Sequence, residues 1–180
     1  MKRSALIMGL LLCVAFQSAM GAGGPKRYPH KETTADMSGA KSIFIGWVDL
    51  PVAEWSLWGY AGRDDWAQVI NDLNLNFKNS CQSKYLAGRT VTGAKDRNDD
   101  NAAGNDLHIK FSDVSIDHDL YGIRLSIHFI DPKTNTEVGS IPTRVYYQKR
   151  WFRFQLYMQA SLEEIGQKIQ AEVTGAAPKK

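Results

Sequence analysis

The spacing of apolar residues changes twice along this chain, and this change limits the fold more than any other feature. Between residues 106 and 147, apolar residues recur at every second position, as in strands with one buried face. Before and after this region they recur every three or four positions, as in amphipathic helices. Each helix must bury one stripe and the sheet one face. The sequence therefore predicts an α+β two-layer sandwich, with a mainly antiparallel sheet of about five strands and two helices on one face.

The predicted strands differ in how their apolar residues are arranged. Residues 43–50 are apolar at odd and even positions, which is typical of a central strand or one covered on both faces, and a short strand follows at 89–95. The cleanest strand places four apolar residues on one face: Ile123, Leu125, Ile127 and Phe129.

Two local features modify the strands around it. In the strand that starts at Asp106, the alternation shifts near Ser112 and Asp113, which predicts a β-bulge. Pro142 cannot donate a hydrogen bond to a neighbouring strand. We therefore expect the strand at 141–147 to lie at an edge of the sheet or to be interrupted.

The first predicted helix covers residues 65–86, with Asp64 or Asp65 as its cap and Gly88 in a left-handed position beyond its end. Its apolar stripe contains Trp66, Val69, Ile70, Leu73, Phe77 and Cys81. Its polar face contains Gln68, Asn71, Asp72, Asn74, Asn76 and Lys78. The second helix runs from about Phe154 to Val173, with Gly175 beyond it.

The amino terminus has the pattern of a secretory signal peptide. Lys2 and Arg3 precede an apolar run, and Ala19 and Gly21 are the small residues expected before a cleavage site after Gly21. The run is too short for a membrane-spanning helix. Cys13 resembles a lipobox cysteine, but Leu12 stands where a small residue is required, which argues against lipid anchoring. We therefore expect a protein exported to the periplasm.

The rest of the chain has room for one domain. Of the 180 residues, 1–21 form the predicted signal peptide, 22–41 a flexible leader, 42–175 a single α+β domain and 176–180 a flexible tail. Cys81 is the only cysteine left after cleavage, so no internal disulfide can form. It is interpreted as a buried structural thiol, with an intermolecular disulfide or a reactive thiol as the alternatives.

Aromatic residues in the loop before the first helix are the most suggestive candidate binding site. Trp55, Trp58 and Tyr60 offer rigid surfaces that can stack on sugars or hold a peptide. The alternative is a lid that seals one end of the core.

A second candidate binding site lies just before the last helix and mixes basic with aromatic residues: Lys149, Arg150, Trp151 and Arg153. This composition indicates contact with a membrane surface or a partner protein. The alternative is a strand-to-helix junction whose arginines extend to water. Nucleic acid is not expected, because basic and acidic side chains nearly balance once Lys2 and Arg3 are removed.

Metal and catalytic motifs are incomplete. The acidic loop at 96–105 resembles an EF-hand loop, but Asn101 replaces the turn glycine and Leu107 the final glutamate. It is interpreted as a solvated connection, with a looser extracytoplasmic calcium site as the alternative. His108, His118 and His128 lack metal-ligand spacing and are expected to be exposed on a polar face, with His108 and His128 not directly paired across strands. We predict no metal, no cofactor and no catalytic residue. The alternative is a metal-dependent or hydrolytic enzyme that uses Asp and His of the central hairpin.

From Ser42 onward the layout resembles the amino-terminal domain of the TolB translocation protein and related uncharacterised bacterial envelope lipoproteins. The resemblance is carried by the strand Ile43 to Asp49, the helix Asp65 to Leu86, the segments 123–131 and 133–139, and the closing helix to Gly175. Asn135 stands where the turn glycine is usual. The resemblance implies a periplasmic binding or assembly module that brings no catalytic residues.

The sequence thus predicts a secreted, non-catalytic binding or envelope-assembly protein. Its expected partner is an envelope protein or a peptidoglycan or glycan component, with peripheral membrane contact as a further option. The oligomeric state stays open.

Overall fold

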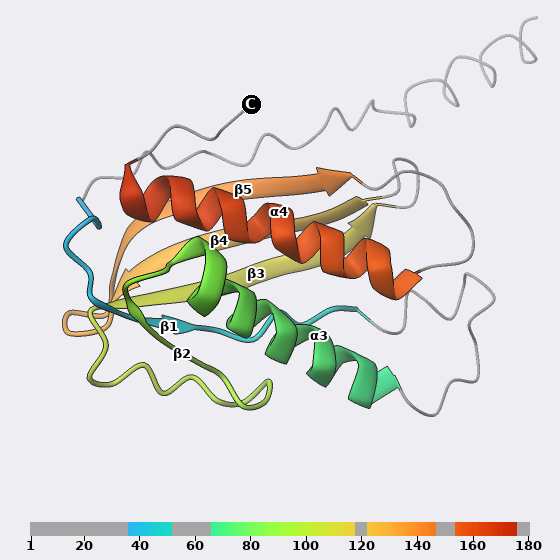
Figure 1. Cartoon of the computed structure of the whole chain (residues 1–180), viewed down its shortest axis with the longest axis horizontal. Coiled ribbons are helices and arrows are strands. Elements are labelled where there is room, and N and C mark those ends of the chain that lie inside the picture. Colours follow the sequence, from blue (N-terminus) through green and yellow to red (C-terminus); the bar gives the residue numbers. More distant parts are fainter. Residues whose placement is uncertain (1–35, 52–65, 118–121, 147–153, 176–180) are drawn as a thin grey trace, which may run out of the picture.

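The computed structural model describes residues 36–51, 66–117, 122–146 and 154–175 (Figure 1). The elements in chain order are β1 (Ser42–Ile45), α3 (Trp66–Ser80), the π-helical turn η2 (Cys81–Tyr85), β2 (Thr90–Gly93), β3 (Leu107–Asp117), β4 (Gly122–Asp131), β5 (Thr136–Tyr146) and α4 (Phe154–Thr174).

The strands form one mixed five-stranded sheet in the order β2-β1-β3-β4-β5. β1 pairs in parallel with both β2 and β3, whereas β3, β4 and β5 form an antiparallel meander with much longer ladders. Both helices lie on the same side of the sheet (Figure 1). The predicted α+β fold is confirmed. β5 is an edge strand, as Pro142 predicted.

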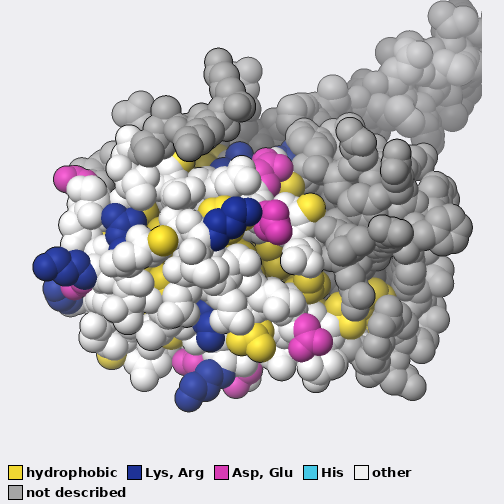
Figure 2. All heavy atoms as spheres, viewed as in Figure 1, with side chains coloured by type: hydrophobic (Ala, Val, Ile, Leu, Met, Phe, Trp, Pro, Cys, Tyr) yellow, Lys and Arg dark blue, Asp and Glu magenta, His cyan; other side chains and the backbone are white. Residues whose placement is uncertain are grey.

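The core lies between the sheet and the two helices. Residues at alternating positions of β4 are buried against them, as the spacing predicted, and so are the apolar stripes of α3 and α4. The largest fully buried side chains include Phe129, Ile43, Ile109, Ile123, Ile127, Met158, Ile165 and Ile169. On the outer side of the helices, basic and acidic side chains are interspersed over the described residues (Figure 2).

The strand predicted at 43–50 is shorter than expected. β1 ends at Ile45, although Val48 and Leu50 are still buried. The backbone of Val48 is held by a side chain instead of a strand: its N–H donates to Asn74 Oδ1 at 2.8 Å, and its carbonyl accepts from Asn74 Nδ2 at 3.1 Å. Asn74 is buried, so its assignment to the exposed face of the helix is wrong. A buried amide satisfies the backbone groups that a missing strand partner would leave unpaired.

The first helix ends in a π turn rather than in regular α-helix. The N–H of Leu86 donates to the carbonyl of Cys81 at 2.7 Å. Tyr85 in this turn is buried against α4, where a Cβ added at Gly166 would lie 2.4 Å from its ring. Gly88 and Gly175 have φ of 87° and 65°, so both take the left-handed conformation expected of them.

The predicted bulge in β3 is confirmed. The pairing register between β3 and β4 shifts between Ser112 and Ser115, and Asp113 has a positive φ of 54°. Asn135, where the resemblance expects a glycine, has φ of 53°. Asparagine tolerates this conformation better than most residues, so it can replace glycine in that turn.

Candidate functional site

The binding residues that the sequence predicted lie outside the described residues. Trp55, Trp58 and Tyr60 fall in 52–65, and the cluster of Lys149, Arg150, Trp151 and Arg153 falls in 147–153. The capping residues Asp64 and Asp65, and His118 in the central hairpin, also fall outside them. Their proposed roles stay predictions.

The face of the sheet opposite the two helices, here called the far face, carries polar side chains in cross-strand rows. The register places Lys110, His128 and Ser140 in one row, and Ser112, Ser126 and Pro142 in the next. A third row pairs Arg124 with Arg144. Residues in one row project to the same face, because strand side chains alternate. Within the described residues, the far face therefore brings together polar groups from β3, β4 and β5.

Ser112 and His128 form a continuous hydrogen-bonded array across the three strands together with Glu137 of β5. His128 Nε2 lies 2.8 Å from Ser112 Oγ, and His128 Nδ1 lies 3.0 Å from Glu137 Oε2. An ionised carboxylate only accepts hydrogen bonds, so Nδ1 carries the hydrogen and donates to Glu137. In the neutral ring Nε2 is then an acceptor for the Ser112 hydroxyl. A hydroxyl, an imidazole and a carboxylate in this order form the arrangement that activates a serine.

Asp113 adds a competing acceptor to this array. Its Oδ2 lies 2.9 Å from Ser112 Oγ, so the single hydroxyl hydrogen of Ser112 is shared between Asp113 and His128. Asp113 is also the bulge residue with positive φ. A positive φ is uncommon for a non-glycine residue, and aspartate, like asparagine, tolerates it better than most residues.

A second polar cluster lies beside the array, where the loop at 94–106 meets β3. The His108 side chain is only 5% exposed, and its Nε2 lies 3.2 Å from Asp100 Oδ1, without the alignment of a hydrogen bond. Asp100 also pairs with Lys110. Burial lowers the pKa of His108. The charge of Asp100 raises this pKa, whereas the charge of Lys110 lowers it. The expectation that this histidine is exposed is wrong, because Phe44 and the loop cover it.

The acidic loop is held by its own hydrogen bonds. Asp99 accepts from the backbone N–H groups of Lys95 and Asn101, and these bonds lower the pKa of its carboxyl group. Within the described part of the chain, no three His, Cys, Asp or Glu side chains are grouped so that they could hold a metal ion. As predicted, His108 and His128 are not directly paired: their partners are Ile130 and Lys110.

Cys81 is a buried thiol, as predicted. Burial raises its pKa to about 12, so almost none of it is thiolate at neutral pH.

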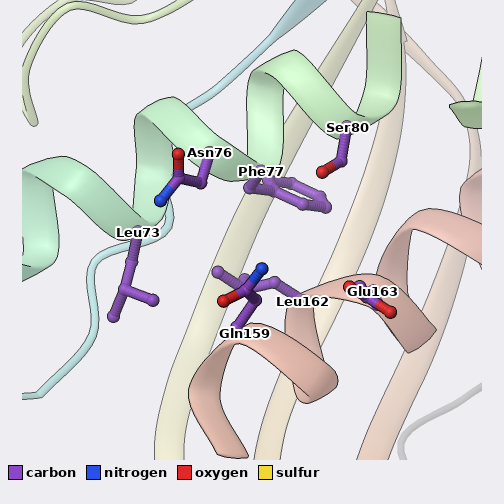
Figure 3. A pocket seen from close by; sticks show the side chains of 7 residues that line it. All are labelled: Leu73, Asn76, Phe77, Ser80, Gln159, Leu162 and Glu163. Atoms are coloured by element: carbon purple, nitrogen blue, oxygen red, sulfur yellow. The ribbon is translucent and has the colours of Figure 1, made fainter. Parts of the chain in front are cut away.

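The hollow between α3 and α4 is too small for a ligand (Figure 3). Its volume is about 10 Å³, the space of a single water molecule. It is lined by Leu73, Asn76, Phe77, Ser80, Gln159, Leu162 and Glu163.

The sequence pattern did not predict Ser112 and Glu137 as partners of His128. Both contacts run diagonally between neighbouring rows of the sheet, so neither residue lies directly opposite the histidine. The register of β3 against β4 is the signal that could have pointed to Ser112, since Ser112 lies one row further along the same face than Lys110, the partner of His128.

Comparisons with known proteins leave the family of this chain open. No protein-family model matches it, and no curated protein matches it. One solved structure, provisionally described as a neuraminyllactose-binding hemagglutinin homolog from Helicobacter pylori, is 13% identical with a TM-score of 0.39, over 81% of this chain and 91% of that chain. This similarity is too low to transfer a function. None of the described helices combines the length and apolar character needed to cross a membrane.

Proposed function

We propose that this protein is exported to the periplasm and acts there as a binding or assembly module for another component of the cell envelope. The observation that carries this proposal is the far face of the sheet. Both helices pack on one face, while the other presents charged and polar side chains at positions fixed by the strand register. Rigid strands with alternating side chains offer a preorganised surface for recognition, which lowers the entropy cost of binding.

The charged groups of this face favour a polar partner. Lys110, Arg124 and His128 lie on it and are partly buried, so their positions are restricted. The predicted partner is an envelope protein or a peptidoglycan or glycan component. Trp55, Trp58 and Tyr60 would add the stacking surface that sugars and peptides require.

Photo-crosslinking in living cells tests this function. Three variants each carry one photoreactive residue, in place of Trp58, of Ser115 on the far face, or of Gln167. Gln167 is an exposed position of α4 and serves as the control. We expect a discrete adduct from position 58 or 115 and none from position 167. Adducts of equal yield at all three positions, or none at any, would contradict a specific interface.

The double variant Trp55→Ala and Trp58→Ala then separates binding from stability. We expect it to abolish the adduct formed from position 115 while the melting temperature stays nearly unchanged. A large loss of melting temperature would show that the aromatic residues seal the core instead.

A further inference from the structure

We propose that Ser112 is an activated nucleophile that takes acyl groups from carboxylic esters, with His128 as its general base and Glu137 as the residue that positions the imidazole. This inference goes beyond binding and does not depend on it. It rests on three observations: the array, the bulge and the accessibility of the array.

The array has the distances that proton transfer requires. Ser112 Oγ lies 2.8 Å from His128 Nε2, within the range of a nucleophile bonded to its base. On the other side of the ring, the contact of 3.0 Å to Glu137 fixes the orientation and the tautomer of His128. The three residues come from β3, β4 and β5, so the rigid meander holds them together.

The bulge begins directly after the nucleophile. The register between β3 and β4 passes from Ser112 to Ser115, so Asp113 and Val114 are left out of the ladder. In serine hydrolases, the N–H of the residue after the nucleophile commonly stabilises the oxyanion. Asp113 occupies this position here, and its positive φ shows that the backbone turns sharply beside Ser112.

The array can be reached from solvent. The side chain of His128 is 25% exposed and that of Glu137 is 34% exposed, while Ser112 is partly buried. The substrate class is therefore an ester whose acyl group approaches from outside, including one carried on a larger molecule.

The reaction balances without any further reagent. Ser112 Oγ attacks the carbonyl carbon while His128 Nε2 takes the hydroxyl proton. The C–O bond to the leaving alkoxide then breaks, and the alkoxide receives that proton from His128. A water molecule attacks the acyl-serine in the same way, its proton again passing through His128. This second step releases a carboxylic acid and restores Ser112.

The purified full chain is tested with p-nitrophenyl acetate and with a fluorophosphonate probe, which phosphonylates activated serines with loss of fluoride. We expect the probe on the peptide that contains Ser112, identified by mass spectrometry. Ser112→Ala should abolish labelling, and His128→Ala should slow it by about 100-fold or more. Ser83→Ala is the control, since Ser83 is an exposed serine of η2 outside the far face, and it should label at the wild-type rate.

Two further variants test the roles of the neighbouring carboxylates. Asp113→Gly keeps a residue suited to positive φ and removes the competing acceptor, so labelling should become several-fold faster. Glu137→Gln should lower kcat for p-nitrophenyl acetate about 10-fold or more, with KM nearly unchanged. Glu137→Asp keeps a carboxylate and should therefore retain part of the wild-type kcat.

Ser112→Cys keeps the proposal testable if the alanine variant does not fold. Beside His128, this thiol should react with iodoacetamide at least about 10-fold faster than the thiol of Ser126→Cys, while the buried Cys81 stays unmodified. Equal rates at positions 112 and 126, or fluorophosphonate labelling of the wild type that is spread over many serines, would overturn the proposal.

Discussion

Asn74 joins two segments that the sheet does not connect. Its side chain accepts from the N–H of Val48 and donates to the carbonyls of Val48 and Ile70, so a single amide ties the chain after β1 to α3. The spacing of apolar residues could not reveal this, because an asparagine on a helix is polar whether it faces water or a backbone. Burial of a polar group depends on its partner, which lies far away in the sequence.

Replacing Asn74 with Ala should destabilise the protein by about 2 to 4 kcal/mol, because the N–H and carbonyl of Val48 lose their buried partner. Urea denaturation followed by circular dichroism measures the free energy of unfolding. Asn76→Ala, an exposed position on the same helix, is the control and should change it by less than about 0.5 kcal/mol. Equal effects of the two substitutions would show that the Asn74 bonds add nothing to stability.

At the level of elements, α4 approaches the π turn closely at Gly166. Gly166 lies against the buried ring of Tyr85, and a methyl group added there would overlap it. The ring cannot move away without disturbing the core. A glycine in mid-helix normally weakens the helix, so its presence here follows from packing rather than from helix preference.

Gly166→Ala should therefore destabilise the protein by about 1 to 3 kcal/mol, although alanine is the better helix former by about 1 kcal/mol. In a Tyr85→Ala background, the same substitution should become neutral or stabilising. Thermal unfolding of the four proteins in this double-mutant cycle measures the coupling. A stabilising effect of Gly166→Ala alone would show that the helix and the ring are not in close contact.

The sequence predicted those elements whose pattern is local. The alternation in β4, the parity shift at the bulge and the stripes of α3 and α4 each depend on residues a few positions apart. The apolar run at 43–50 predicted a central strand, and β1 lies inside the sheet, but its parallel pairing with β2 and β3 could not be read in this way, because it depends on distant segments. The Ser112–His128–Glu137 array was missed for the same reason: it requires the register of three strands at once.

For the whole molecule, the compartment is the prediction on which the proposed function depends. Mass spectrometry and amino-terminal sequencing of the protein from fractionated cells should find a chain that begins at Ala22 in the periplasmic fraction. An intact chain that starts at Met1 and stays in the cytosol would remove the basis for an envelope partner. It would leave the nucleophile proposed at Ser112 untouched.

The position of β1 also bears on when the domain can form. Ser42 pairs with Thr90 and Ile43 pairs with Leu107, so both neighbours of this strand are synthesised long after it. Bringing such distant segments together costs chain entropy before any pairing energy is gained. A nascent polypeptide therefore carries β1 without its partners until β2 and the start of β3 have left the ribosome. For the proposed export, this delay would suit a secretion channel that threads unfolded chains, and a chaperone would be useful on the way to that channel.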